Sequence, residues 1–282
     1  MTLAVRTNPG WEASLALEFS ARATRSVVSH RAHHGPLHVQ KAFYPETDGT
    51  CHIYVLHPPG GVVGGDALHI DLALHPGAQA LVTTPAATKF YRSGERYAAQ
   101  TLRAQVTGGA TLEWLPQETI VFDGAWARNS TRVELARDAR FIGWEVVCLG
   151  RTVNRETFTL GAWQQRFEVW RDGTPLFIDR SNVLGDATVL AQAWGWAGYS
   201  VSGVLVCAAA DVPRELVQTL REACAALQRD GVFAATQLRG VLVCRYLGHH
   251  AQYARACLQR AWEIVRPVVL GKAAQTPRIW NT

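Results

Sequence analysis

Residues Leu56 to Ser93 read LHPPGGVVGGDALHIDLALHPGAQALVTTPAATKFYRS, and their pattern sets the architecture predicted for the whole chain. Apolar and polar side chains alternate over residues 67–74, a period of two that predicts a half-buried β-strand. The turn at His75-Pro-Gly reverses the chain, and a second apolar run ends at Pro85. The segment is therefore predicted to be a strand–turn–strand unit.

Two glycine pairs, Gly60-Gly61 and Gly64-Gly65, and then Asp66 precede the first of these strands. Such pairs indicate a backbone that bends sharply or approaches another segment closely. A phosphate-binding loop has a similar outer glycine spacing. However, Asp66 stands where that loop needs a lysine, and a strand rather than a helix follows. A nucleotide site is therefore excluded, whereas an acid at this position would attract a cation.

The strand–turn–strand unit recurs as a weak internal repeat. Its turns are centred on Gly77, Gly109 and Asp138, at intervals of about 30 residues, which indicates stacked β layers that cover one another's hydrophobic faces. Asp172-Gly173 adds the signal of a β-hairpin turn. We therefore predict a mainly β (α+β) fold with stacked strand layers, a β-helix-like or sandwich body, and two helices in the C-terminal third.

The length of 282 residues suits a single domain. We expect three parts within it: a β body over residues 1–200, a helix-containing cap over 201–270, and an extended tail over 271–282 that Trp280 holds in place. The body is predicted to open with a strand over residues 11–21, and residues 51–56 form a further strand.

Helical periodicity after residue 200 distinguishes the cap from the body. Asp211 is the expected N-cap of a first helix, and residues 251–265 place an apolar stripe on one face of a second. Two strands are predicted between the helices, near 232–238 and 241–247.

Composition limits the partners and the compartment. Hydrophobic residues make up 48% and charged residues 18%, with ten tryptophans, so the surface should keep apolar area for protein partners. The net charge of +5 is scattered, which argues against nucleic acid. The six cysteines form no CxxC pair and are predicted to be buried free thiols of a cytoplasmic protein. No signal peptide or membrane-spanning segment is expected.

Three acids lie within or beside apolar strands: Asp66, Glu145 and Asp179. A charge in such a place is costly unless it is paired or faces water or a cation. One explanation is salt bridges, for which the nearby cations in sequence are Lys89, Arg92, Arg151 and Arg180. The other is a water-filled path whose oxygen ligands hold a divalent ion loosely enough to pass it on.

Four histidines, His30, His33, His34 and His38, surround Gly35-Pro36. Because glycine and proline interrupt the run, we predict a basic, solvated loop. A metal site is the alternative.

The sequence holds no recognisable catalytic motif. Its serines lack a nucleophile-elbow context, and neither His-Glu-x-x-His nor a two-histidine, one-carboxylate spacing occurs. We expect a protein that is not an enzyme. A metal-dependent hydrolase with an unrecognised carboxylate site and a purely structural adaptor remain as alternatives.

Five motifs together resemble the UreD family of urease accessory proteins, also called UreH. They lie in family order along the chain: HPPGGVVGGD (57–66), TTPAATKFYRS (83–93), WLPQETIVFDGA (114–125), EVVCLGR (145–151) and PRIWNT (277–282). The resemblance implies a scaffold, or chaperone, for nickel insertion into urease, with an all-β, helix-capped body and an internal tunnel for the ion.

The resemblance also implies partners and cofactors. The partners are apo-urease and two further accessory proteins, one of them a nickel-delivering GTPase. No cofactor would be tightly bound, because Ni²⁺ is in transit and GTP belongs to a partner. Neither nucleic acid nor a membrane is involved, and the number of copies in the complex, a dimer included, stays open.

The residues carried over from the family fall into two groups. Asp66, Thr88 and Glu145 match polar positions proposed to line the tunnel, and Asp179 joins them without a flanking motif. The second group is structural or partner-facing: Gly60, Gly61, Gly64, Gly65, Lys89, Arg92 and Trp280. Lys89 and Arg92 belong there because two cations would hinder a passing Ni²⁺.

Overall fold

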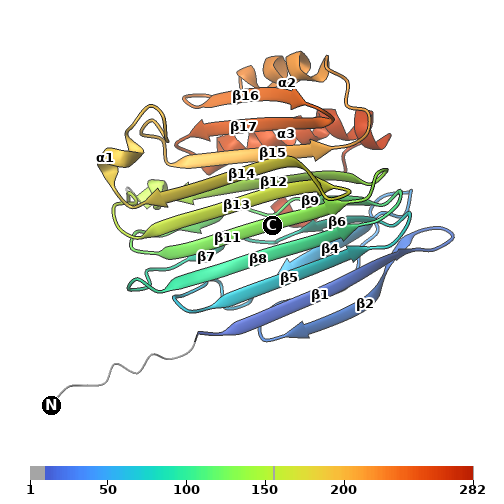
Figure 1. Ribbon diagram of the computed structural model, residues 1–282, viewed down its shortest axis with the longest axis horizontal. Coiled ribbons are helices and arrows are strands. Elements are labelled where there is room, and N and C mark those ends of the chain that lie inside the picture. The colour runs from blue at the N-terminus through green and yellow to red at the C-terminus, as the bar shows by residue number, and fades with distance from the viewer. Residues whose placement is uncertain (1–9, 155, 282) are drawn as a thin grey trace.

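The computed structural model describes residues 10–154 and 156–281, which form two facing β-sheets with helices on one outer side (Figure 1). The first sheet has the strand order β14 (Thr174–Leu184), β13 (Ala162–Arg171), β11 (Trp126–Leu135), β8 (Tyr97–Val106), β5 (Ala67–Leu74), β1 (Glu12–Ala21) and β2 (Ser26–His34). The second sheet has the order β16 (Val232–Leu238), β17 (Val241–Gly248), β15 (Val201–Ala208), β12 (Arg140–Leu149), β9 (Thr111–Trp114), β6 (Gln79–Thr83), β4 (Cys51–Leu56) and β3 (His38–Val39), with β10 (Thr119–Val121) joining β12 to β7 (Thr88–Phe90). The predicted mainly β fold is confirmed.

The predicted repeat is a set of stacked units that cross between the sheets. In each unit a strand of the first sheet turns into a strand of the second, and β5–β6, β8–β9 and β11–β12 pair in parallel with their counterparts. The turns stack as well, since the Gly77 amide donates to the Gly108 carbonyl over 2.9 Å. Solenoid-like layers therefore form most of the body, and the expected turn at Asp172-Gly173 joins β13 to β14, with positive φ at both residues.

Burial follows the alternation of the sequence. In β5 every second residue is buried, with its side chain between the two sheets. In β12, by contrast, every residue after Arg140 is buried, because α2 (Leu216–Ala225) and α3 (Ala251–Leu270) cover the outer face of the second sheet. The second sheet consequently separates two cores, one between the sheets and one beneath the helices.

The core beneath the helices is built on α3. Its inward stripe includes Cys257, Leu258, Trp262 and Val265, all fully buried. Each large apolar side chain buried in this way contributes about 1.5–3 kcal/mol. The strands of residues 201–270 continue the second sheet, so the predicted cap and the body share one sheet.

Details of the C-terminal third differ from the sequence prediction. Asp211 is not a helix N-cap, because α2 begins at Leu216 with Glu215 at the N-cap. Pro213 keeps the preceding residue from helical geometry and so delays the helix. The predicted strands at 232–238 and 241–247 are confirmed, whereas α3 runs past residue 265 to Leu270.

Three short helices were not predicted, and one of them is the 3-10 turn η1 (Thr152–Asn154) between β12 and β13. A one-turn helix, α1 (Ala187–Leu190), projects between β14 and β15, and the tail ends in a 3-10 turn, η2 (Arg278–Asn281), rather than a fully extended segment (Figure 1). Asp186 caps α1 by accepting from the Thr188 and Val189 amides.

The predicted loop around the histidines is wrong for residues 26–34, which form β2. This strand pairs antiparallel with β1 at the edge of the first sheet, and its residues from Ser29 on are exposed. Backbone pairing with β1 suffices to form a strand there, because an edge strand tolerates polar side chains on exposed faces. The turn falls at Gly35-Pro36, as the sequence indicates.

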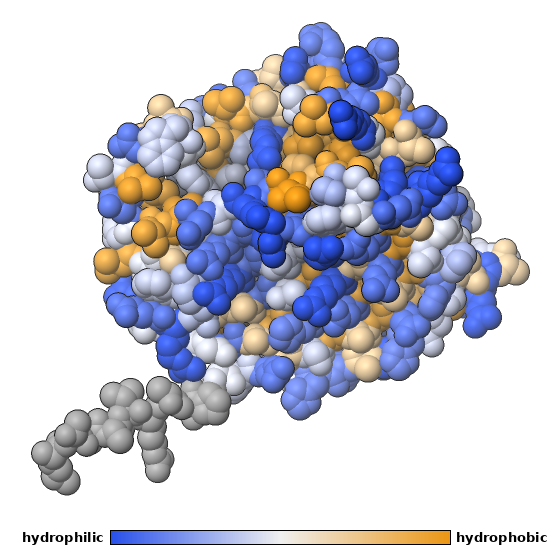
Figure 2. All heavy atoms as spheres, in the orientation of Figure 1, coloured by the Kyte–Doolittle hydropathy of each residue, from blue (hydrophilic) through white to orange (hydrophobic). Residues whose placement is uncertain are grey.

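All six cysteines are free and buried, as predicted. Within the described residues, no helix is long and apolar enough to cross a membrane. On the face seen in Figure 2, hydrophilic side chains prevail over the lower strands, and hydrophobic ones gather near α1 and toward the helices.

Candidate functional site

A cavity of about 130 Å³ lies between the two sheets. It is bordered by the segments 84–89 and 116–119, where the chain passes from β6 to β7 and from β9 to β10. Pro85 and Pro116 interrupt strand pairing in these segments, since proline has no amide hydrogen to donate. The polar side chains of the lining include Thr88, Lys89, Gln100, Asn129, Thr131 and Glu145.

Glu145 is the acidic residue of this cavity. It lies on β12, and its Oε1 accepts from the Thr131 hydroxyl over 2.5 Å and its Oε2 from the Gln165 amide over 2.5 Å. Burial raises the pKa of Glu145 to about 7, the two hydrogen bonds oppose that rise, and the charge of Asp179 adds to it. In the described part of the chain no cation pairs with Glu145, so the salt-bridge explanation is wrong for this residue.

Thr88 lines the same cavity and belongs to the same sheet as Glu145, with β10 between their strands. It begins β7, which pairs with β10, and it is half-buried. Lys89 also lines the cavity. The sequence indicates a structural or partner-facing role for Lys89, but its position is beside the candidate path of the ion.

Asp66 has a structural role beside the cavity. Its Oδ2 accepts from the Val63 amide over 2.9 Å, and its Oδ1 accepts from the Trp11 amide over 2.8 Å. It thereby closes the glycine turn and holds the start of β1, and no salt bridge involves it within the described residues. Its charge reaches His57, a residue of the cavity lining, where it opposes the effect of burial, which lowers the pKa of His57.

The glycine pairs permit close packing against residues 91–96. A side chain at Gly61 would place its Cβ 2.0 Å from the Tyr91 ring, and one at Gly65 would meet Arg96 at 2.0 Å. Gly64 packs on Ser93 in the same way. The backbone of Gly60 has a positive φ of 77°, which favours glycine. These contacts support the structural role expected for the glycines.

Asp179 pairs with a cation that sequence reasoning did not consider. Its Oδ2 lies 2.8 Å from Nη1 of Arg245 on β17. Arg180, the nearest cation in sequence, faces the other side of β14 and pairs with Glu168. The salt-bridge explanation is therefore right for Asp179, but the partner comes from the other sheet.

Arg92 and Trp280 lie away from the cavity lining. Arg92 is 71% exposed at its side chain and lies 3.5 Å from Asp123, which leaves it accessible to a partner. Trp280 donates to the Thr83 hydroxyl over 2.8 Å and packs against Trp144 and Trp262, so it connects the tail to the second sheet.

The histidines do not form a metal site in the structure. Rings of His33 and His38 are 6.3 Å apart, and His30, His33 and His34 are exposed along β2. Across residues 10–154 and 156–281, no group of three or more His, Cys, Asp or Glu is arranged to hold a metal ion.

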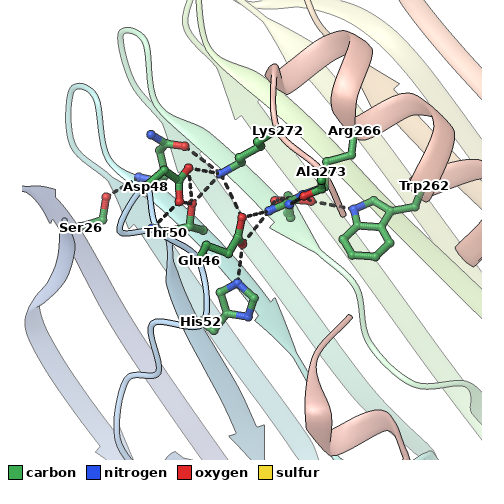
Figure 3. A network of polar contacts seen from close by, with 11 residues as sticks. Ser26, Glu46, Asp48, Thr50, His52, Trp262, Arg266, Lys272 and Ala273 are labelled. Carbon is green, nitrogen blue, oxygen red and sulfur yellow. Dashed lines mark hydrogen bonds and ion pairs between the residues drawn. The ribbon is translucent and has the colours of Figure 1, made fainter. Parts of the chain in front are cut away.

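Sequence reasoning missed a buried network on the outer face of the second sheet (Figure 3). Arg266 of α3 is fully buried and bonds to Glu113 at 2.9 Å and to Glu46 at 2.7 Å. His52 lies 2.6 Å from Glu46 on its other side. Lys272 extends the network to Asp48 and Thr50. An arginine inside the apolar stripe of α3 was the available signal.

Comparison with known proteins gives a consistent result. The family model described as UreD urease accessory protein matches residues 12–281. "Urease accessory protein UreD" of Dechloromonas aromatica (strain RCB) is 46% identical over 277 residues, 98% of this chain and 96% of that protein. The protein of the same name from Azoarcus sp. (strain BH72) is 46% identical over 97% of this chain and 95% of its own. "Urease accessory protein UreD 2" of Brucella anthropi is 42% identical over 97% of this chain and 99% of its own.

Proposed function

Because the chain belongs to the UreD family of urease accessory proteins and so serves in urease maturation, we propose that its own part is nickel insertion. In this proposal the chain is a scaffold that binds apo-urease and two further accessory proteins, one of them a nickel-delivering GTPase. Ni²⁺ is the cargo, and it passes through the cavity between the sheets. GTP stays on the partner, and the chain itself carries out no catalysis.

The observation that carries this proposal is Glu145, a buried acid that lines a cavity and has only neutral hydrogen-bond donors as partners. Burying a carboxylate without a cation is costly, so a fold that needed only stability would gain from an apolar residue there. With a pKa of about 7, Glu145 exchanges its proton near neutral pH. A divalent cation that enters the cavity can therefore displace that proton and bind the carboxylate.

The rest of the lining favours passage over storage. Thr88, Asn129 and Thr131 supply neutral oxygen atoms, which bind divalent cations weakly. Lys89 lines the same cavity, and its positive charge opposes tight binding of a second cation. A site with one carboxylate, the single imidazole of His57, neutral oxygens and a nearby ammonium group suits an ion in transit.

Exposed apolar side chains support the binding of protein partners. Leu160, Leu184 and Trp194 are 60%, 56% and 79% exposed. They belong to the segments around α1, where hydrophobic surface gathers in Figure 2. Surface of this kind is typical of contact between proteins.

Glu145→Ala tests the proposal in cells that keep the other accessory genes. We expect urease purified from them to contain less nickel, while the variant still copurifies with its partners. Asp66→Ala combined with Glu145→Ala should lower the nickel content further, although part of that loss would reflect the glycine turn that Asp66 closes.

Glu134→Ala is the matched control, because Glu134 pairs with Arg132 on the exposed side of β11. Its nickel loading should equal that of the parent protein. Normal loading with Glu145→Ala would contradict the channel and leave a structural adaptor as the function. Turnover of a substrate by the purified chain in the presence of Ni²⁺ or Zn²⁺ would instead reveal a hydrolase.

A further inference from the structure

Strand register brings Arg245 to the inner side of the second sheet. Glu145 of β12 lies beside Val204 of β15, and Val204 lies beside Arg245 of β17. Paired residues of neighbouring strands point to the same side of a sheet. Arg245 therefore points toward the first sheet, as Glu145 does, but two strands nearer to the edge.

The first sheet has a matching row. Thr131 of β11 lies beside Phe167 of β13, and Phe167 lies beside Asp179 of the edge strand β14. Two separate polar contacts thus join the first sheet to the second. Glu145 meets Thr131 in the interior, and Arg245 meets Asp179 at the edge, 66 residues away in sequence.

The direct line between these contacts is apolar, because Phe167 and Val204 are buried there. The adjacent row is polar. Gln165 donates to Glu145 over 2.5 Å and lies beside Ser181 of β14. Gln165 and Ser181 are both half-buried, unlike the buried Glu145.

The second sheet contributes Ser202 to the same polar row. Ser202 lies two residues before Val204 on β15, so it faces the same inner side, and it is half-buried. Glu145 is thus buried, whereas Gln165 and the two serines beyond it are all half-buried. A row of polar side chains therefore extends from Glu145 toward the edge where β14 faces β17, and the ion pair of Asp179 with Arg245 spans that edge.

We propose that Arg245 is the gating residue of an exit from the cavity, located between β14 and β17. This inference rests on the proposed function and specifies how the cargo leaves. While Arg245 pairs with Asp179, the edge is closed and the carboxylate is occupied. A divalent cation that passes Gln165 competes with the guanidinium for Asp179, and Arg245 then moves into solvent.

The partial exposure of Arg245 and Asp179 allows Arg245 to leave the ion pair. The side chain of Arg245 is 50% exposed and that of Asp179 is 28% exposed. Ion pairs at such exposure are weak, so they exchange readily with water and with other ions. Arg266 is fully buried between two carboxylates and could not serve in this way.

Thiol labelling tests the gate without nickel. Ser202→Cys places a thiol on the inner side of the edge, and the six native cysteines are buried. The purified complex with its accessory partners is treated with a cationic methanethiosulfonate, and the parent complex gives the background. Adding Arg245→Gln should raise the labelling rate by about fivefold, because losing an exposed ion pair should increase the population of the open edge by about that factor. Arg245→Lys should leave it close to the parent rate.

Arg180→Gln is the matched control, because it removes the same charge from the outer side of β14. Equal labelling with Arg245→Gln and Arg180→Gln would overturn the gate. Nickel loading of urease by the same complexes separates the two proposals. If Glu145→Ala lowers loading while labelling is unchanged by Arg245→Gln, the gate alone is wrong. If labelling rises but neither Glu145→Ala nor Arg245→Gln alters loading, the edge opens, but the proposed nickel path is wrong and with it the gate's role for the cargo.

Discussion

Glu113 and Glu145 are buried on opposite sides of the second sheet, and their surroundings differ in one respect. Glu113 points outward from β9 beneath α3, where Arg266 and the Trp262 indole donate to it. Glu145 points inward from β12, where its donors are the neutral side chains of Thr131 and Gln165. A paired buried charge joins two elements, whereas an unpaired one retains the capacity to bind a proton or a cation. The outer glutamate is thus structural, and the inner one is the candidate for function.

The largest loss of stability is expected from removing Arg266, the buried cation on the outer face of the second sheet. Arg266→Met leaves Glu113 buried without a cation and leaves Glu46 with His52 and Lys272. Breaking a buried ion pair in this way costs about 3–5 kcal/mol. Urea unfolding measures the loss. Arg260→Met is the control, because Arg260 forms a partly exposed pair with Glu263 on the same helix, so its cost should stay below about 0.5 kcal/mol. A similar loss in both variants would remove the distinction between the two faces.

A smaller, pH-dependent effect is expected at the inner face. The folded pKa of Glu145, about 7, lies above its ordinary value of 4.5. Its contribution to stability is therefore fully present below pH 4.5 and is lost as the pH rises through 7. Glu145→Gln avoids this loss, so its stability relative to the parent should rise by about 2 kcal/mol between pH 5 and pH 8.

Glu113→Gln is the comparison for that experiment. It deprives Arg266 of one carboxylate, so we expect it to destabilise the protein at both pH values. Unfolding curves of the three proteins at pH 5 and pH 8 provide the measurement. A pH-independent effect of Glu145→Gln would show that the inner carboxyl does not take up a proton in the folded state.

The smallest effect on stability is expected at the gate. Asp179→Asn removes an ion pair that is partly exposed, and such pairs contribute about 0–1 kcal/mol. Thermal unfolding should therefore hardly change. A loss as large as that of Arg266→Met would mean that Asp179 and Arg245 hold the sheets together rather than close an opening.

The candidate site was only partly predictable. Glu145 was recognised as an acid within an apolar strand, yet Glu113, between Leu112 and Trp114, carries the same signal and was overlooked. Periodicity of two shows that a residue faces one side of a sheet, but it does not show what covers that side. Arg266 reaches Glu113 from 153 residues away, a contact that no local pattern encodes.

Local patterns determined the stacked units of this protein. Alternation and the turns at Gly77, Gly109 and Asp138 specify strand–turn–strand layers, because each layer must cover the apolar face of the next. Glycine spacing specified the close packing at Gly61 and Gly65, where a Cβ would clash with Tyr91 or Arg96. The motifs of the chain also identified its family.

Tertiary structure alone decided which polar groups meet. β2 became a strand through pairing with β1 despite its polar sequence. Asp179 pairs with Arg245 rather than with its neighbour Arg180, because strand register determines which side chains of each strand point between the two sheets. Charge pairing depends on distance and burial in three dimensions, and both arise only when sheets that are distant in sequence face each other.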